Sequence, residues 1–167
     1  MLKKMGLVVV ALLLVLAACG DDSGGGLSAE EQAKAVEIAA ELTGDTTPEN
    51  PFGNEAAATC FSEGIVSSFG LARINELDTG TGVEAGFANM TAAEQETVAD
   101  LALSCIDFNT VMKDQMLAGG LSEAQANCVA EGLNNDLLKG LFLAQIRGED
   151  VTQNAELMSV VMGCLTG

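Results

Sequence analysis

The chain has 167 residues, of which 24 are acidic and 7 are basic, and its formal net charge at pH 7 is −17. A charge this negative argues against nucleic acid as a partner and against electrostatic docking on an anionic membrane. The absence of histidine excludes Ser-His-Asp triads, Cys-His dyads and His-ligated metal sites. The hydrophobic fraction of 49% is typical of a globular chain, and the length suits one domain or two small ones.

The N-terminal segment has the pattern of an export signal. Lys3 and Lys4 precede an apolar run over residues 5–18. A helix that spans a bilayer needs about 20 residues, so this run is too short to span and is typical of the apolar part of a secretory signal peptide. We therefore expect residues 1–18 to be a signal peptide.

The run ends in Leu16-Ala17-Ala18-Cys19, which closely resembles the lipobox of bacterial lipoproteins. The resemblance implies that cleavage falls just before Cys19 and that this cysteine carries a diacylglyceryl group. Two acyl chains are enough for stable anchoring. We therefore expect the protein to have the cell membrane as its partner and to be attached to the extracytoplasmic face through the lipid anchor at Cys19.

Residues 19–27 follow as a tether. Gly and Ser dominate residues 23–26 and form a flexible coil, and Asp21 and Asp22 keep it solvated. Loss of Lys3 and Lys4 leaves 5 basic and 24 acidic side chains, a formal charge of −19 on the mature chain.

Residues 28–53 predict an N-terminal helix and a linker. Ser28-x-x-Glu31 is a capping box that opens a helix to about Thr43, just before Gly44. Residues 45–53 contain both prolines of the chain, which is typical of a linker.

Four cysteines remain after Cys19: Cys60, Cys105, Cys128 and Cys164. An exported chain meets an oxidising compartment, so an even remainder indicates two disulfides. Zinc is the alternative, but structural zinc sites use closely spaced pairs, and no two of these cysteines are closer than 23 residues.

An internal repeat favours one pairing. Residues 54–65 align without gaps on residues 122–133, with six of twelve positions identical. Residues 98–105 and 157–164 share an apolar i, i+3, i+4, i+7 pattern that ends in cysteine, as in an amphipathic helix. Each repeat therefore predicts two helices joined by one bridge, Cys60–Cys105 and Cys128–Cys164, and crossed pairing between repeats stays open.

The predicted fold is all-α: two tandem disulfide-stapled helical repeats preceded by one N-terminal helix. No sustained period-two alternation indicates a strand. In repeat 1 (54–120) we expect helices over 54–69, 71–77, 91–107 and, in continuation, 108–117. In repeat 2 (121–167) we expect a helix capped by Ser122, a helix over 136–146 after an Asx cap in 134–136, and a helix over 152–165.

The body also resembles uncharacterised exported lipoproteins of actinobacteria. Those carry tandem segments of the form C-x-x-E/D-G/A-apolar, with a second cysteine some 35–45 residues later, and the resemblance covers about residues 54–167. It implies an address in the cell envelope and no mechanism.

Two pairs of residues recur beside the first cysteine of each repeat. Glu63 and Glu131 could form a carboxylate pair, but a solvated helix position is the favoured interpretation. Gly64 and Gly132 lie inside predicted helices, where Gly costs about 1 kcal/mol, which indicates either close approach of another helix or a helix break.

The sequence offers no further site. Residues 78–84 hint at a calcium loop, yet glycines stand where ligands are needed. No S-x-x-K, dinucleotide or phosphate-loop motif is present. We assign no catalytic residue, no metal and no cofactor.

We expect a non-enzymatic interaction or adaptor module in the cell envelope that binds an envelope protein. The alternative is a carrier or binding protein for a lipid or other apolar ligand, with any cavity among the phenylalanines of repeat 1. A hydrolase with paired carboxylates is the third class considered.

Overall fold

A computed structural model describes residues 26–44, 50–78, 86–87 and 89–166. Within these ranges all regular structure is helical, and the all-α prediction is confirmed. The segment with Cys19 and most of the 78–84 loop lie outside the described residues.

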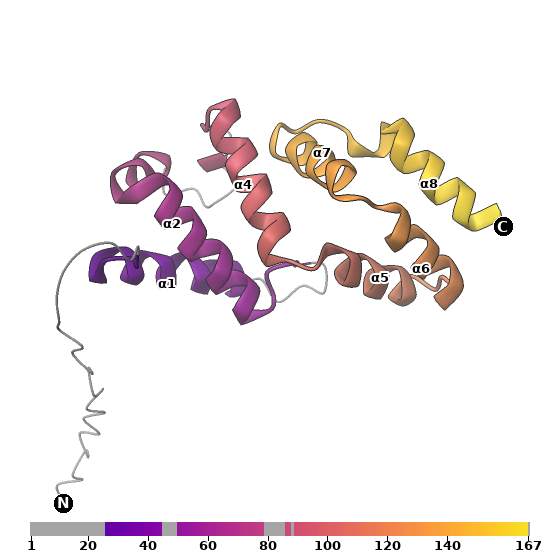
Figure 1. The fold of residues 1–167 in the computed structure, drawn as a ribbon, viewed down its shortest axis with the longest axis horizontal. Helices are drawn as coiled ribbons and strands as arrows, with labels where there is room; N and C mark the ends of the chain where they lie inside the picture. The colour runs from indigo at the N-terminus through magenta and orange to yellow at the C-terminus, as the bar shows by residue number, and fades with distance from the viewer. Residues whose placement is uncertain (1–25, 45–49, 79–85, 88, 167) are drawn as a thin grey trace, which may run out of the picture.

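Figure 1 shows an elongated arrangement, with α1 at one end and α8 at the other. The elements are α1 (Ala29–Gly44), α2 (Glu55–Leu77), α4 (Ala92–Cys105), α5 (Phe108–Ala118), α6 (Glu123–Gly132), α7 (Asn135–Ile146), the 3-10 turn η1 (Val151–Gln153) and α8 (Ala155–Thr166).

The helices begin where capping residues stand in the sequence. The hydroxyls of Ser28, Thr91 and Ser122 each accept a hydrogen bond, at 3.3 Å, from the backbone N–H three residues later. The Glu or Gln at that position accepts the cap's own N–H in return. The Asn134 side chain accepts the N–H of Leu137 at 2.8 Å, which confirms the predicted Asx cap.

Gly70 divides α2 into two segments. Its φ of 69° and ψ of 161° are not helical, and φ in this region favours glycine. The predicted stop at Gly70 is therefore confirmed as a kink, and residues 71–77 continue as helix beyond it.

Two predicted helices are wrong at their ends because polar side chains cap at positions the periodicity did not mark. The helix expected over 91–107 ends at Cys105, since Asp107 caps α5 by accepting the N–H of Thr110 at 3.1 Å. The helix expected from 152 begins at Ala155, since Asn154 accepts the N–H groups of Glu156 and Leu157.

Two disulfides form, Cys60–Cys105 and Cys128–Cys164, each within one repeat. Both join Cα atoms 5.6 Å apart, and they close loops of 45 and 36 residues. In the chain-entropy model each bridge contributes about 4 kcal/mol to the stability of the fold. The pairing inferred from the repeat is thus confirmed.

Each bridge is followed by a close helix contact of the same kind. One turn after Cys60, a Cβ on Gly64 would lie 2.6 Å from Cδ2 of Leu101, one turn before Cys105. One turn after Cys128, a Cβ on Gly132 would lie 2.5 Å from Cγ1 of Val160. The close approach considered for both glycines is confirmed, and at Gly132 helix α6 also ends.

Two hydrophobic cores fill the molecule. The first surrounds Phe61, Val66 and Val98, and the second consists of the buried residues Val129, Leu133, Leu137 and Leu138. Phe108 packs against both and meets the ring of Phe142 edge-on at 6.3 Å. Helices α4 and α7 also pack together, and Lys139 Nζ lies 2.7 Å from Asp100 Oδ1. The two halves therefore share a contact through α4, α5 and α7.

An added methyl group should have opposite effects on stability at two glycines, Gly132 and Gly140. Gly132→Ala should lower the free energy of unfolding by about 1–3 kcal/mol, because the added Cβ would lie 2.5 Å from Cγ1 of Val160, and a β-branched side chain in a helix strongly prefers one χ1 rotamer. Gly140→Ala is the matched control, because nothing lies within 4 Å of its added Cβ, and it should raise stability by up to about 1 kcal/mol. Urea unfolding with intact disulfides measures both. Equal stability of the two variants would contradict the close packing, and a Val160→Ala background should remove the cost at Gly132.

Candidate functional site

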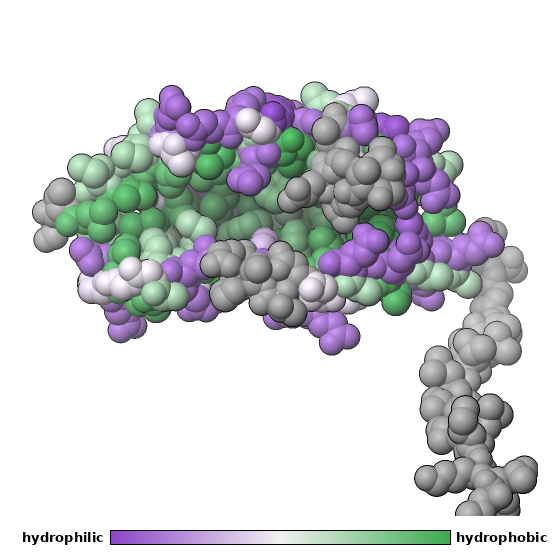
Figure 2. All heavy atoms as spheres, turned by 180° about the vertical axis from the view of Figure 1, so that it is seen from behind, coloured by the Kyte–Doolittle hydropathy of each residue, from purple (hydrophilic) through white to green (hydrophobic). Residues whose placement is uncertain are grey.

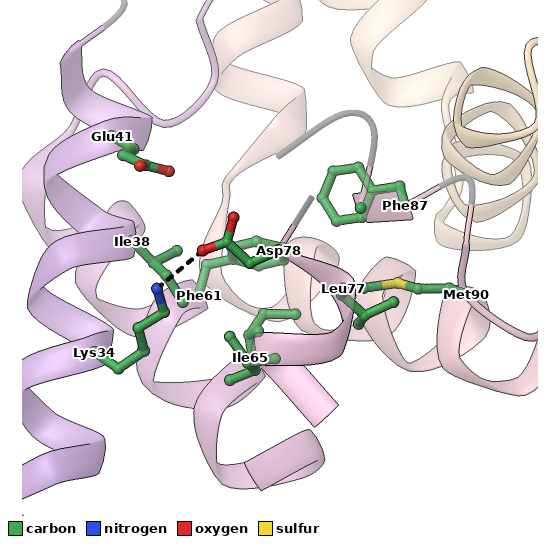
Figure 3. Close-up of a pocket in the computed structure, with 11 residues that line it drawn as sticks. Lys34, Ile38, Glu41, Phe61, Ile65, Leu77, Asp78, Phe87 and Met90 are labelled. Atoms are coloured by element: carbon green, nitrogen blue, oxygen red, sulfur yellow. Dashed lines mark hydrogen bonds and ion pairs between the residues drawn. The ribbon is translucent and has the colours of Figure 1, made fainter. Parts of the chain in front are cut away.

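A cleft of about 180 Å³ lies between α1, both segments of α2, and the residues Gly86, Phe87 and Met90. Its wall is apolar and includes two aromatic rings, as Figure 3 shows: Ile38, Phe61, Ile65, Ile74, Leu77, Phe87 and Met90. Lys34, Glu41 and Asp78 stand among the lining residues as its charged groups. The expectation that any cavity lies among the phenylalanines of repeat 1 agrees with this position.

Helical spacing brings these side chains to one place. Lys34, Ile38 and Glu41 are at i, i+4 and i+7 on α1 and so share a face of that helix. Phe61 and Ile65 come from α2 before the kink, and Ile74 and Leu77 from the segment after it. The kink at Gly70 thus lets both segments of α2 line the same cleft.

The charged margin of the cleft is net negative. Lys34 Nζ lies 3.1 Å from Glu37 Oε1 and 3.5 Å from Asp78 Oδ2, which ties α1 to the end of α2. Partial burial acts to lower the pKa of Lys34, but the hydrogen bonds and charges of Glu37 and Asp78 together raise it, so the ammonium stays charged. Glu41 is exposed and directs its carboxylate over the cleft (Figure 3). The cleft lining therefore carries two carboxylates, Glu41 and Asp78, against the one ammonium of Lys34, which Glu37 and Asp78 already engage.

A second ion-pair cluster holds the segment that carries Met90. Arg73 binds Glu94 through two bonds, Nε to Oε1 at 2.7 Å and Nη2 to Oε2 at 3.0 Å. Arg73 also donates to the carbonyl of Asn89 at 3.3 Å, next to Met90. The Arg73 guanidinium, with the Thr91 N–H, lowers the pKa of Glu94 to about 2. The strongly shifted groups are thus tied to each other, and they position one wall of the cleft.

Among the candidate residues, Glu63 and Glu131 are exposed on different helices, α2 and α6. In the described part of the chain no three Cys, Asp or Glu side chains gather into a group that could hold a metal ion. The four cysteines of the body are all in disulfides. Cys19 and the candidate calcium loop beyond Asp78 lie outside the described residues.

The C-terminal helix presents an apolar face to solvent that sequence reasoning missed. Met158, Met162 and Leu165 are 47%, 53% and 44% exposed. Apolar atoms reach the surface at this end of the molecule, on the left in Figure 2. The signal was present: α8 carries apolar residues on a second stripe, i, i+4 and i+7, beyond those that pack inward, and Glu156 is its one charged residue.

None of the described helices combines the length and the apolar character that crossing a membrane requires. Comparison of the chain with protein-family models, curated proteins and solved structures gives no match. The fold and the site define an all-α, disulfide-stapled protein with an apolar cleft in its first core and an apolar face of α8 exposed to solvent.

The Arg73–Glu94 pair predicts a loss of stability in acid. The pKa of Glu94 is about 2 in the folded chain against an ordinary 4.5, so below pH 4.5 the unfolded chain binds the extra proton first. Stability should be fully present above pH 4.5 and fall as the pH drops towards 2. Glu94→Gln should flatten this part of the pH profile in urea unfolding, whereas the exposed, charge-matched Glu131→Gln should keep it. Parallel profiles for wild type and Glu94→Gln would contradict the assignment.

Proposed function

We propose that this chain is a lipid-anchored lipoprotein of the cell envelope whose body is a non-enzymatic adaptor for another envelope protein. The observation that carries the adaptor role is the exposed apolar face of α8 on a strongly acidic protein. The anchor is supported by the sequence, through Lys3, Lys4, the apolar run and the lipobox that ends in Cys19.

The negative charge of the chain indicates that acyl chains, and not electrostatic attraction, hold the protein on the membrane. The mature chain carries a formal −19, which like-charged lipid repels. A diacylglyceryl group at Cys19 supplies two acyl chains, which hold a protein stably where one is marginal. The Gly- and Ser-rich residues 23–26 give the folded body freedom above the membrane.

The position of α8 suits an adaptor. The tether leads into α1, and α8 lies at the other end of the long axis (Figure 1), so its apolar face is held away from the anchored end. Protein interfaces combine an apolar centre, poor in charge, with a polar rim. Methionine adapts its shape to different partners. A partner with an apolar patch and a basic rim fits this face best, and the acidic body disfavours a second copy of the chain.

A second function, binding of a small apolar ligand, is favoured by the cleft between α1 and α2. Its volume of about 180 Å³ is below the roughly 300–1,000 Å³ of sites for drug-sized ligands. It is close to that of an engineered apolar cavity, about 150 Å³, that binds benzene. The cleft therefore suits a small apolar group better than the acyl chains of a whole lipid.

The anchor is tested by Cys19→Ala in the full-length chain expressed in a bacterial host. Without the acceptor sulfur no diacylglyceryl group attaches, so the protein should leave the detergent-rich phase of a phase-separation assay and lose the mass of the lipid. Ser23→Ala, which keeps the lipobox, should behave as wild type. A Cys19→Ala protein that still partitions with membranes would sink the lipoprotein proposal.

The adaptor role is tested by replacing Met158, Met162 and Leu165 together with Gln, a residue of similar helix propensity. In-envelope crosslinking followed by affinity measurement with the captured protein should show binding at least tenfold weaker, about 1.4 kcal/mol. Val36→Gln removes an apolar side chain that is 69% exposed on α1 and serves as the control. Unchanged crosslinking by the α8 variant, with its helix content retained, would falsify the role of this face.

A further inference from the structure

We propose that the cleft between α1 and α2 binds a small organic cation, an ammonium group on an apolar body of about the size of a benzene ring. The inference rests on the second proposed function, ligand binding, and names the class of ligand. It is carried by three properties of the same site: an apolar floor, two aromatic rings and a margin with excess negative charge.

The apolar floor selects the body of the ligand. Phe61 is 1% exposed and Ile65 and Ile74 are 7% exposed, and all three belong to the first core. Leu77, which is 6% exposed, is buried beside them in the cleft wall. A preformed apolar site of about 180 Å³ accommodates a single ring or a short alkyl group. The packing of Met90 against the same core completes the wall with a flexible thioether.

The aromatic lining and the carboxylates determine which charge on the ligand the cleft favours. Phe61 lines the cleft from within the core, whereas Phe87 is partly exposed, and aromatic faces attract cations. Glu41 directs its carboxylate over the opening, and Asp78 lies across from it (Figure 3). The acidic body as a whole raises the local concentration of cations at such a site.

An anionic ligand fits this margin poorly. Lys34 is the cation among the lining residues, and its ammonium is already engaged by Glu37 at 3.1 Å and Asp78 at 3.5 Å. A carboxylate that bound Lys34 would have to displace these partners and then lie near Glu41. A cationic group placed between Glu41 and the Phe87 ring is attracted by both and leaves the Lys34 pairs intact.

Three probes of nearly equal size separate the contributions: 2-phenylethylammonium, 2-phenylethanol and phenylacetate. Each is titrated into the mature chain, with its disulfides intact and methyl groups labelled, in non-ionic detergent micelles, with protein-free micelles as the blank. The ammonium compound should shift the methyl signals of Ile65 and Met90 saturably and leave those of Val160 in place. Its Kd should be about threefold to tenfold lower than that of the alcohol, since each exposed carboxylate contributes a factor of about 1.4 to 5. Phenylacetate should bind most weakly.

Glu41→Gln should reduce the affinity for the ammonium compound about twofold to fivefold and leave the alcohol unchanged. Glu30→Gln is the matched control, since it removes the same charge from the same helix outside the cleft lining. Equal losses in the two variants would show that the general field, and no specific site, attracts the cation, and would overturn the proposal.

The probes also separate this inference from the function on which it rests. If the alcohol or phenylacetate binds as tightly as the ammonium compound, the cleft remains a ligand site but its assignment to cations is overturned. If none of the three shifts the methyl signals of Ile65 and Met90 at concentrations up to about 20 mM, ligand binding in the cleft is itself overturned.

Discussion

The rest of the structure depends on how closely two antiparallel helices approach beside each disulfide. Each bridge joins Cα atoms 5.6 Å apart and so holds the two helix backbones side by side at that point. One turn further on, there is no room for a Cβ, and Gly64 and Gly132 stand there. Glycine inside a helix costs about 1 kcal/mol, which the contribution of about 4 kcal/mol from each bridge offsets. Cysteine and glycine four residues apart are thus one structural unit.

The two copies of this unit support different surfaces. In the first half, the kinked α2 and the packing of α1 on it leave an apolar cleft, and all six phenylalanines of the chain belong to that core or pack against it. Around the second core, α5 from repeat 1 packs on α6 from repeat 2, and Met112 and Met116 of α5 pack on that core. Only one face of α8 packs on this core, and none of residues 155–165 is fully buried. The two repeats therefore share the same disulfide arrangement but expose different surfaces.

The parts of the fold that local chemistry determines could be predicted. Capping boxes mark the starts of α1, α4 and α6, and the repeat indicates which cysteines pair. The break before α5 was missed because Asp107 is compatible with a helix interior as well as with a cap, and only its bonds to Thr110 decide. The outer face of α8 was missed because periodicity alone does not show which of two apolar stripes on a helix packs inward. The exact lining of the cleft depends on non-local packing across the kink at Gly70.

One electrostatic property connects the proposals. If the proposed cleavage before Cys19 occurs, the remaining chain carries a formal −19. In the proposals, this charge leaves attachment to anionic lipid to the lipid anchor and favours an ammonium ligand at the carboxylates of the cleft. It also disfavours self-association through α8 and favours a partner of opposite charge. The cleft and the α8 face lie in different halves. Among the described residues, the contacts that join the two cores include the packing of α4 on α7, where Lys139 and Asp100 meet, and the contact of Phe108 with Phe142. A ligand in the cleft changes the affinity of the α8 face only if it changes the relative free energies of states that these contacts connect, by displacing one core against the other or by rigidifying both.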